Sequence, residues 1–162
     1  MLTLQNQNLT LCVDPFGAQM MELGSKQGTQ FLWNGDKQYW PDRAPVLFPT
    51  VGNVRGGTTI INGKPYALKR HGFARNLEHS VLDSGANFIA YSLKDSEETR
   101  KLYPFVFELR VTYRLIENGL TTEFAVFNRG DEELPFGIGG HPGFRCPLVP
   151  GERFGDYRIL FE

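Results

Sequence analysis

Apolar and polar residues alternate along much of the chain, and a period of two predicts antiparallel strands with one dry face and one wet face. The longest run covers residues 105–116, and a second alternating run covers residues 120–126. Glu117-Asn118-Gly119 separates the two runs. Because Asn and Gly tolerate positive φ, an Asn-Gly tip between alternating runs predicts a β-hairpin.

The same signal recurs at Asn62-Gly63, which predicts a second hairpin from residues 58–61 and 65–68. Shorter runs predict further strands at residues 8–13, 18–23, 77–82, 86–94 and 157–161. Helical signal is confined to residues 36–40 and 96–102, and Ser96 is expected to cap the second of these.

Many strands separated by Gly, Pro and Asn turns favour an all-β fold, and we expect a large antiparallel β-sandwich. No internal repeat, low-complexity tract or linker divides the chain, so residues 1–162 are expected to form a single domain.

Charge and composition exclude several classes of protein. Seventeen Lys and Arg residues against eighteen Asp and Glu give a net charge of −1, without a long basic stretch, so no nucleic-acid partner is expected. No segment approaches the roughly 20 apolar residues of a membrane span, and the first residues lack a signal-peptide pattern. We therefore expect a cytoplasmic protein with no membrane partner. Cys12 and Cys146 lack a CxxC pairing and are expected to be reduced.

Two of the three histidines lie in similar glycine-flanked settings, Arg70-His71-Gly72-Phe73 and Gly139-Gly140-His141-Pro142. An imidazole exchanges protons near neutral pH, and flanking glycines allow a ligand to approach the backbone closely. A sugar site would suit this pair, although a lone histidine in a β-protein is more often structural. His79 is expected to be a solvated strand residue. The histidines lack the spacings of common metal motifs, so no metal site is expected.

Further segments join the two histidine motifs in one collinear series: Leu32-Trp33-Asn34-Gly35-Asp36, Tyr39-Trp40, the loop 44–52 with Arg55, Arg70–Arg75, Tyr103-Pro104-Phe105, Asn128–Asp131 and Gly139–Phe144. With this series the chain closely resembles the aldose 1-epimerase family, the galactose mutarotase-like proteins, in its bacterial LacX-like branch.

The resemblance implies a β-sandwich with an open sugar cleft, and a reaction that interconverts the α and β anomers of an aldose by ring opening. An acid protonates the ring oxygen while a base deprotonates the anomeric hydroxyl, and no cofactor is required. On this basis His141 is expected to be the general acid. His71 is expected to hydrogen-bond near the reacting centre, and Arg55 to hold sugar hydroxyls.

Two further residues are candidates for substrate contacts. Phe144 is one of several aromatic residues, with Trp33, Trp40 and Phe73, on which a pyranose could stack, although most such residues belong to the core. Arg75 could recognise a sugar phosphate, although an arginine beside a loop is usually only solvated. The expected partner is therefore a small-molecule aldose or sugar phosphate.

The chain departs from the family at the general base, which is a glutamate near the C-terminus of the complete protein. No glutamate of this chain lies in a matching context, and the apolar strand pattern at 157–161 is unfinished at Glu162. We therefore expect an N-terminal fragment of a mutarotase-like protein, inactive when isolated. A carbohydrate-binding or sugar-phosphate-sensing module without turnover stays open as the alternative function.

Overall fold

The structure is a computed structural model that describes residues 1–161, and nearly all of its regular structure is β. The strands are β1 (Leu2–Gln5), β2 (Leu9–Asp14), β3 (Gln19–Ser25), β4 (Val46–Leu47), β5 (Thr58–Ile61), β6 (Lys64–Ala67), β7 (Ser80–Ser84), β8 (Phe88–Lys94), β9 (Phe107–Ile116), β10 (Gly119–Asn128) and β11 (Gly139–Gly140). The helical elements are α1 (Glu97–Leu102) and the short 3-10 turns η1 (Arg55–Gly57), η2 (Ala74–Asn76) and η3 (Phe154–Asp156). Within the described part, no helix is long and apolar enough to span a membrane.

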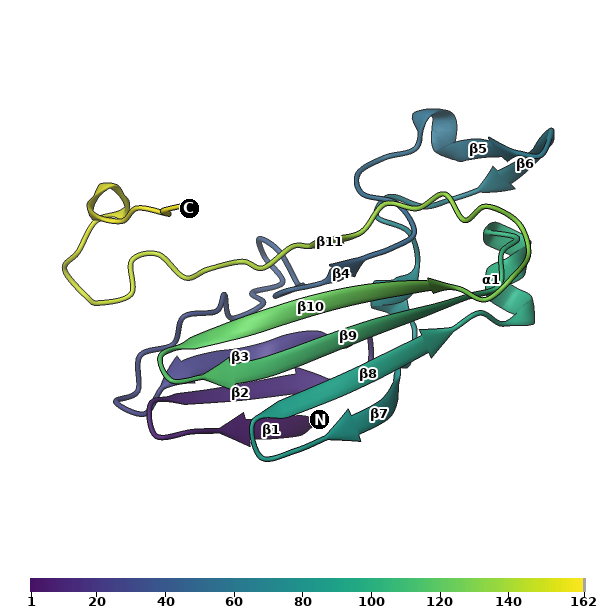
Figure 1. The fold of residues 1–162 in the computed structure, drawn as a ribbon. Helices are drawn as coiled ribbons and strands as arrows, with labels where there is room; N and C mark the ends of the chain where they lie inside the picture. Colours follow the sequence, from purple (N-terminus) through teal and green to yellow (C-terminus); the bar gives the residue numbers. More distant parts are fainter. Residues whose placement is uncertain (162) are drawn as a thin grey trace.

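Two antiparallel sheets face each other and form the predicted β-sandwich (Figure 1). One sheet has the order β1-β2-β3, and the other has the order β10-β9-β8-β7. Alternate side chains of β2 and β9 are buried in a shared core, because successive residues of a strand point to opposite faces. The Tyr113 hydroxyl crosses this core and donates to Ala18 O at 2.8 Å. A buried tyrosine of this kind satisfies its polar end while its ring fills the core.

Both predicted hairpins are confirmed, and so is the capped helix. Strands β5 and β6 pair across the Asn62-Gly63 turn. Both turn residues have positive φ, 49° and 75°, as expected for a tight hairpin turn. In the longer hairpin, Gly119 already pairs with Ile116. Ser96 caps α1, because its side chain accepts from Thr99 N.

Other expectations need correction. The predicted strand at 157–161 is wrong, because none of these residues takes part in a strand and Leu160 and Phe161 are almost fully exposed. A strand needs a neighbour to accept its backbone hydrogen bonds, and the described residues provide none there; Glu162 lies outside them. Residues 36–40 form a single turn rather than a helix, and Tyr39 N–H and Trp40 N–H both donate to Asp36 O. The strand predicted at 77–82 is shifted toward the C-terminus, where the structure has β7 (Ser80–Ser84). Strands β1, β4 and β11 were not predicted.

His79 is a core residue, and the expectation of a solvated side chain is wrong. Only 1% of its surface is exposed, and its Nδ1 lies 3.0 Å from Leu77 O. Because a carbonyl oxygen only accepts, Nδ1 carries the proton. Nε2 is buried and has no hydrogen-bond partner among the described residues. Burial lowers the pKa of His79, so the ring is neutral in the folded protein.

Glu108 lies on the face of β9 opposite the core residues, yet only 3% of its surface is exposed. Its carboxylate accepts from Arg110 Nε at 2.7 Å, from Arg129 Nη2 at 2.6 Å and from Ser92 Oγ at 3.1 Å. Both guanidinium groups also lie over the ring of Phe127. Hydrogen bonds from Arg110 and then Arg129 lower the pKa of Glu108 to about 2. This cluster ties together β8, β9 and the chain that follows β10.

Replacing Glu108 with Gln is expected to lower the free energy of unfolding at pH 7 by roughly 2 kcal/mol, because the buried carboxylate loses its charge-assisted hydrogen bonds with two partly exposed arginines. A carboxylate with a depressed pKa stabilises the fold fully above its ordinary pKa of 4.5 and loses this effect as the pH falls toward 2. The difference in free energy of unfolding between the native chain and the Glu108→Gln variant should therefore become smaller between pH 4.5 and pH 2. Urea unfolding followed by tryptophan fluorescence measures it.

The matched control is Glu98→Gln, which removes an exposed ion pair with Lys101. Such a pair contributes little, so this variant should unfold like the native chain. If the difference in free energy of unfolding between the native chain and Glu108→Gln stays constant from pH 7 to pH 2, the role given to the ionised carboxylate is contradicted.

Candidate active site

The candidate site is built around the backbone of residues 43–52, which receives hydrogen bonds from two distant parts of the chain. On one side β11 pairs with β4, and the pairing continues as His141 N–H donates to Pro45 O at 3.1 Å and Gly143 N–H to Arg43 O at 2.7 Å. The Gly139–Phe144 motif therefore runs alongside this segment (Figure 1).

The other histidine motif binds the same segment from its other side. Phe73 N–H donates to Phe48 O at 2.9 Å, and His71 N–H donates to Gly52 O at 2.9 Å. His71 and Gly72 both have positive φ, 67° and 70°. At Gly72 an added Cβ would lie 2.1 Å from Phe48 O, so only glycine allows this close approach.

These contacts bring the two imidazole rings together. The ring centroids of His71 and His141 are 5.7 Å apart with an angle of 46° between the planes. The indole of Trp40 lies edge-on to His141, with 5.3 Å between centroids. A cleft of about 430 Å³ opens beside the pair and is lined by Trp40, Asp42, Pro45, Leu47, Arg70, His71, Arg75 and His141. Its size is in the range of small-molecule sites.

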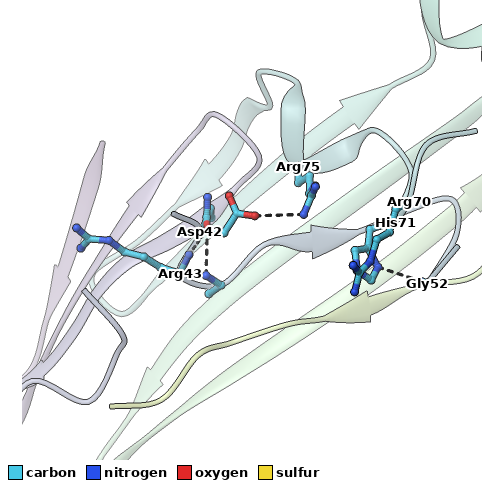
Figure 2. Close-up of polar contacts among 8 residues, drawn as sticks. Asp42, Arg43, Gly52, Arg70, His71 and Arg75 are labelled. Atoms are coloured by element: carbon cyan, nitrogen blue, oxygen red, sulfur yellow. Dashed lines mark hydrogen bonds and ion pairs between the residues drawn. The ribbon is translucent and has the colours of Figure 1, made fainter. Parts of the chain in front are cut away.

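His71 is held as a neutral ring. Its Nδ1 accepts from Gly52 N–H at 3.0 Å, as Figure 2 shows. Burial, followed by the charges of Arg70, Arg75 and His141, lowers the pKa of His71. His141, in contrast, has an exposed side chain at the cleft. The two histidines, alike in sequence context, therefore differ in their surroundings.

Asp42 and Arg75 form an ion pair in the same cleft. Arg75 Nη1 donates to Asp42 Oδ2 at 3.2 Å, and both side chains are partly exposed (Figure 2). Asp42 is the one carboxylate that lines this cleft in the described part of the chain. Within residues 1–161, no group of three or more His, Cys, Asp and Glu side chains is arranged to hold a metal ion.

The structure brings His71, His141 and Arg75 to one cleft, and it places Arg55 and Phe144 elsewhere. Arg55 is exposed and lines a neighbouring cavity of about 720 Å³, which shares Arg70 with the histidine cleft. Phe144 is 57% exposed and forms an isolated bridge with Leu32. The substrate-binding roles expected for Arg55, Arg75 and Phe144 stay predictions.

Asp42 and Arg70 line the cleft but were not singled out from the sequence. Arg70 carried a usable signal, because it directly precedes His71 in the motif. Asp42 carried none, because its position in the cleft depends on the pairing of residues 43–52 with both histidine segments.

Comparison with known proteins shows which proteins this chain is similar to. A family model described as "Aldose 1-epimerase" matches residues 1–156. The "Protein LacX, chromosomal" of Lactococcus lactis subsp. lactis is 37% identical over 167 residues, covering 99% of this chain and 56% of that protein.

Solved structures agree in fold. A galactose mutarotase related enzyme from Lactobacillus acidophilus is 41% identical, with a TM-score of 0.91 over 94% of this chain and 51% of that one. A galactose mutarotase-like protein from Lactobacillus casei is 32% identical, with a TM-score of 0.88 over 93% of this chain and 51% of that one. The β-sandwich is thus of the galactose mutarotase type, and this chain spans about half the length of these relatives.

Gly72→Ala is expected to destabilise the chain by roughly 3 kcal/mol, because it adds both positive-φ strain and a clash with Phe48 O. Gly57 has the same φ of 70° with no atom near its added Cβ. Gly57→Ala therefore measures φ strain alone, expected at about 1 kcal/mol. Urea unfolding compares the two, and equal losses would contradict the close approach of Gly72 to the 43–52 backbone.

Proposed function

The chain belongs to the aldose 1-epimerase family, and from this we propose that it supplies the acid and part of the sugar-binding cleft of an enzyme that interconverts α and β anomers of an aldohexose. The observation that supports the proposal most directly is the pairing of His71 and His141 across one cleft, with 5.7 Å between ring centroids.

Anomer exchange requires two proton transfers. As the bond between the anomeric carbon and the ring oxygen breaks, an acid donates a proton to the ring oxygen. A base removes the proton from the anomeric hydroxyl, whose oxygen becomes the carbonyl oxygen of the open-chain aldose. Reclosure onto the other face of the carbonyl gives the other anomer. A positioned acid or base typically contributes a factor of about 10²–10⁴ in rate.

We assign the acid to His141. Its side chain is exposed at the cleft, so solvent can return the proton that the ring donates. Its backbone is held by Pro45 O, and Pro142 favours an extended conformation at His141, so the direction of the ring is restricted. Trp40 packs edge-on against the ring. His71, neutral and fixed at Nδ1, is suited to donate a hydrogen bond from Nε2 near the reacting centre.

The general base is proposed to lie in a segment outside this chain. The carboxylate that lines the described cleft, Asp42, is already engaged in an ion pair with Arg75. The relatives extend over about twice the length of this chain, and their additional half has room for the family's glutamate. The substrate is proposed to be an aldose or a sugar phosphate, and Arg75 is the candidate contact for a phosphate.

A carbohydrate-binding module without turnover is the second candidate. It is favoured by one observation, the lack of an unpaired carboxylate among the described residues that line the cleft. Saturable sugar binding without faster anomer exchange, in protein extended to the length of the relatives, would decide for this alternative.

Replacing His141 with Ala is expected to lower the rate of anomer exchange by about 10²–10⁴-fold in the extended protein, because proton donation to the ring oxygen is lost. Exchange is measured by NMR or polarimetry on freshly dissolved α-D-galactose and α-D-glucose. The control is Lys64→Gln, which removes an exposed charge on β6 outside the cleft and should leave the rate unchanged. An unchanged rate in the His141→Ala variant would refute the assignment of the acid.

The 162-residue chain alone is expected to accelerate anomer exchange little or not at all, because it lacks the proposed base. The same NMR measurement checks this. Exchange by the isolated chain at the rate of the extended protein would show that the base lies within residues 1–162.

A further inference from the structure

Beside the cleft, the Nε–H group of Arg70 points at a ring nitrogen of His71. Arg70 Nε lies 3.0 Å from His71 Nε2, and Gly52 N lies 3.0 Å from His71 Nδ1. Each contact places an N–H group against a nitrogen of the imidazole. A neutral imidazole accepts at only one nitrogen, because the other carries its proton. The ring therefore cannot accept both hydrogen bonds.

The contact with Gly52 is the one that the fold holds in place. It is a backbone N–H, and the same two residues are also joined in the reverse direction by His71 N–H to Gly52 O at 2.9 Å. Arg70 has an exposed side chain that is free to adjust. Nδ1 of His71 is thus the acceptor, and Nε2 carries the proton.

This tautomer leaves two donors 3.0 Å apart, because the arginine Nε–H is always protonated. Two N–H groups that face each other repel, and the repulsion is relieved when the exposed Arg70 side chain turns so that both N–H groups point at one acceptor oxygen beside them. Arg70 and His71 both line the histidine cleft, so such an oxygen would come from the ligand. A hydrogen bond from a guanidinium is charge-assisted and stronger than one between neutral groups.

We propose that Arg70 and His71 form a two-donor site that binds one hydroxyl or ring oxygen of the sugar, which makes Arg70 a substrate-binding residue. This inference rests on the proposed function in one respect, that the ligand of the cleft is a sugar. Arg70 also lines the neighbouring cavity that contains Arg55. The two-donor site therefore lies on the wall shared by the two cavities.

The first test measures the tautomer of His71 without any ligand. In the chain labelled with ¹⁵N at histidine, long-range ¹H–¹⁵N NMR spectra should show His71 with its proton on Nε2. The Arg70→Gln variant should give the same pattern, because the Gly52 contact determines it. A proton on Nδ1 in the native chain would overturn the proposal, since Nε2 would then simply accept from Arg70.

The second test measures sugar binding. D-Galactose and D-glucose are titrated into the extended protein, and the His71 resonances report binding. Arg70→Gln should weaken binding about tenfold, the effect of losing one charge-assisted hydrogen bond. Arg70→Lys should recover part of the loss, because it keeps the charge but not the Nε–H. Lys64→Gln, the matched removal of one exposed cation, should bind like the native chain.

Failure of this inference can be told apart from failure of the proposed enzyme. Weaker galactose binding by Arg70→Gln, in a protein that does not accelerate anomer exchange, would support the two-donor site and reject catalysis. Affinity within about twofold of the native value in Arg70→Gln would overturn the site even if anomer exchange is observed. Lack of any binding of either sugar would overturn it as well.

Discussion

The candidate site depends on one backbone segment, residues 43–52, that hydrogen-bonds along both of its sides. The segment 139–143 binds one side through Pro45 O and the short β4–β11 pairing, and the segment 71–74 binds the other through Phe48 O and Gly52. Two motifs that are about seventy residues apart in sequence thereby lie on a common support. If either set of hydrogen bonds were lost, the histidine rings would no longer face one cleft.

This support requires a special backbone conformation beside His71, and it explains Gly72. Gly72 allows the chain to pass so close to Phe48 O that a side chain would clash. Gly139 and Gly140 form β11 against β4. Gly72 thus serves the pairing of backbone with backbone more directly than it serves contact with a ligand. The same backbone pairing places the His71 and His141 side chains at the cleft.

His71 and His141 have similar sequence settings but different contacts in the structure. His71 is neutral, because burial and the nearby positive charges disfavour its protonation, and its Nδ1 is occupied by a backbone N–H. A ring held in this way is suited to donate one hydrogen bond in a fixed direction. His141 is exposed and contacts Trp40 at its edge, so solvent has access to it. This difference supports proton donation by His141 and binding by His71 and Arg70.

The sequence by itself determined the strands with strong alternation, the Asn62-Gly63 hairpin, the Ser96 cap and the two histidine motifs, because these depend on neighbours within a few residues. The tertiary structure decided the features that depend on distant partners. The two-residue strands β4 and β11 pair with each other across about ninety residues, and His79 is buried although its direct neighbours, Glu78 and Ser80, are polar. The apolar run at 157–161 has no strand partner among the described residues. Asp42 and Arg70 join the cleft, and Arg55 lines the adjacent cavity, because backbone pairing across long sequence separations sets where each loop lies.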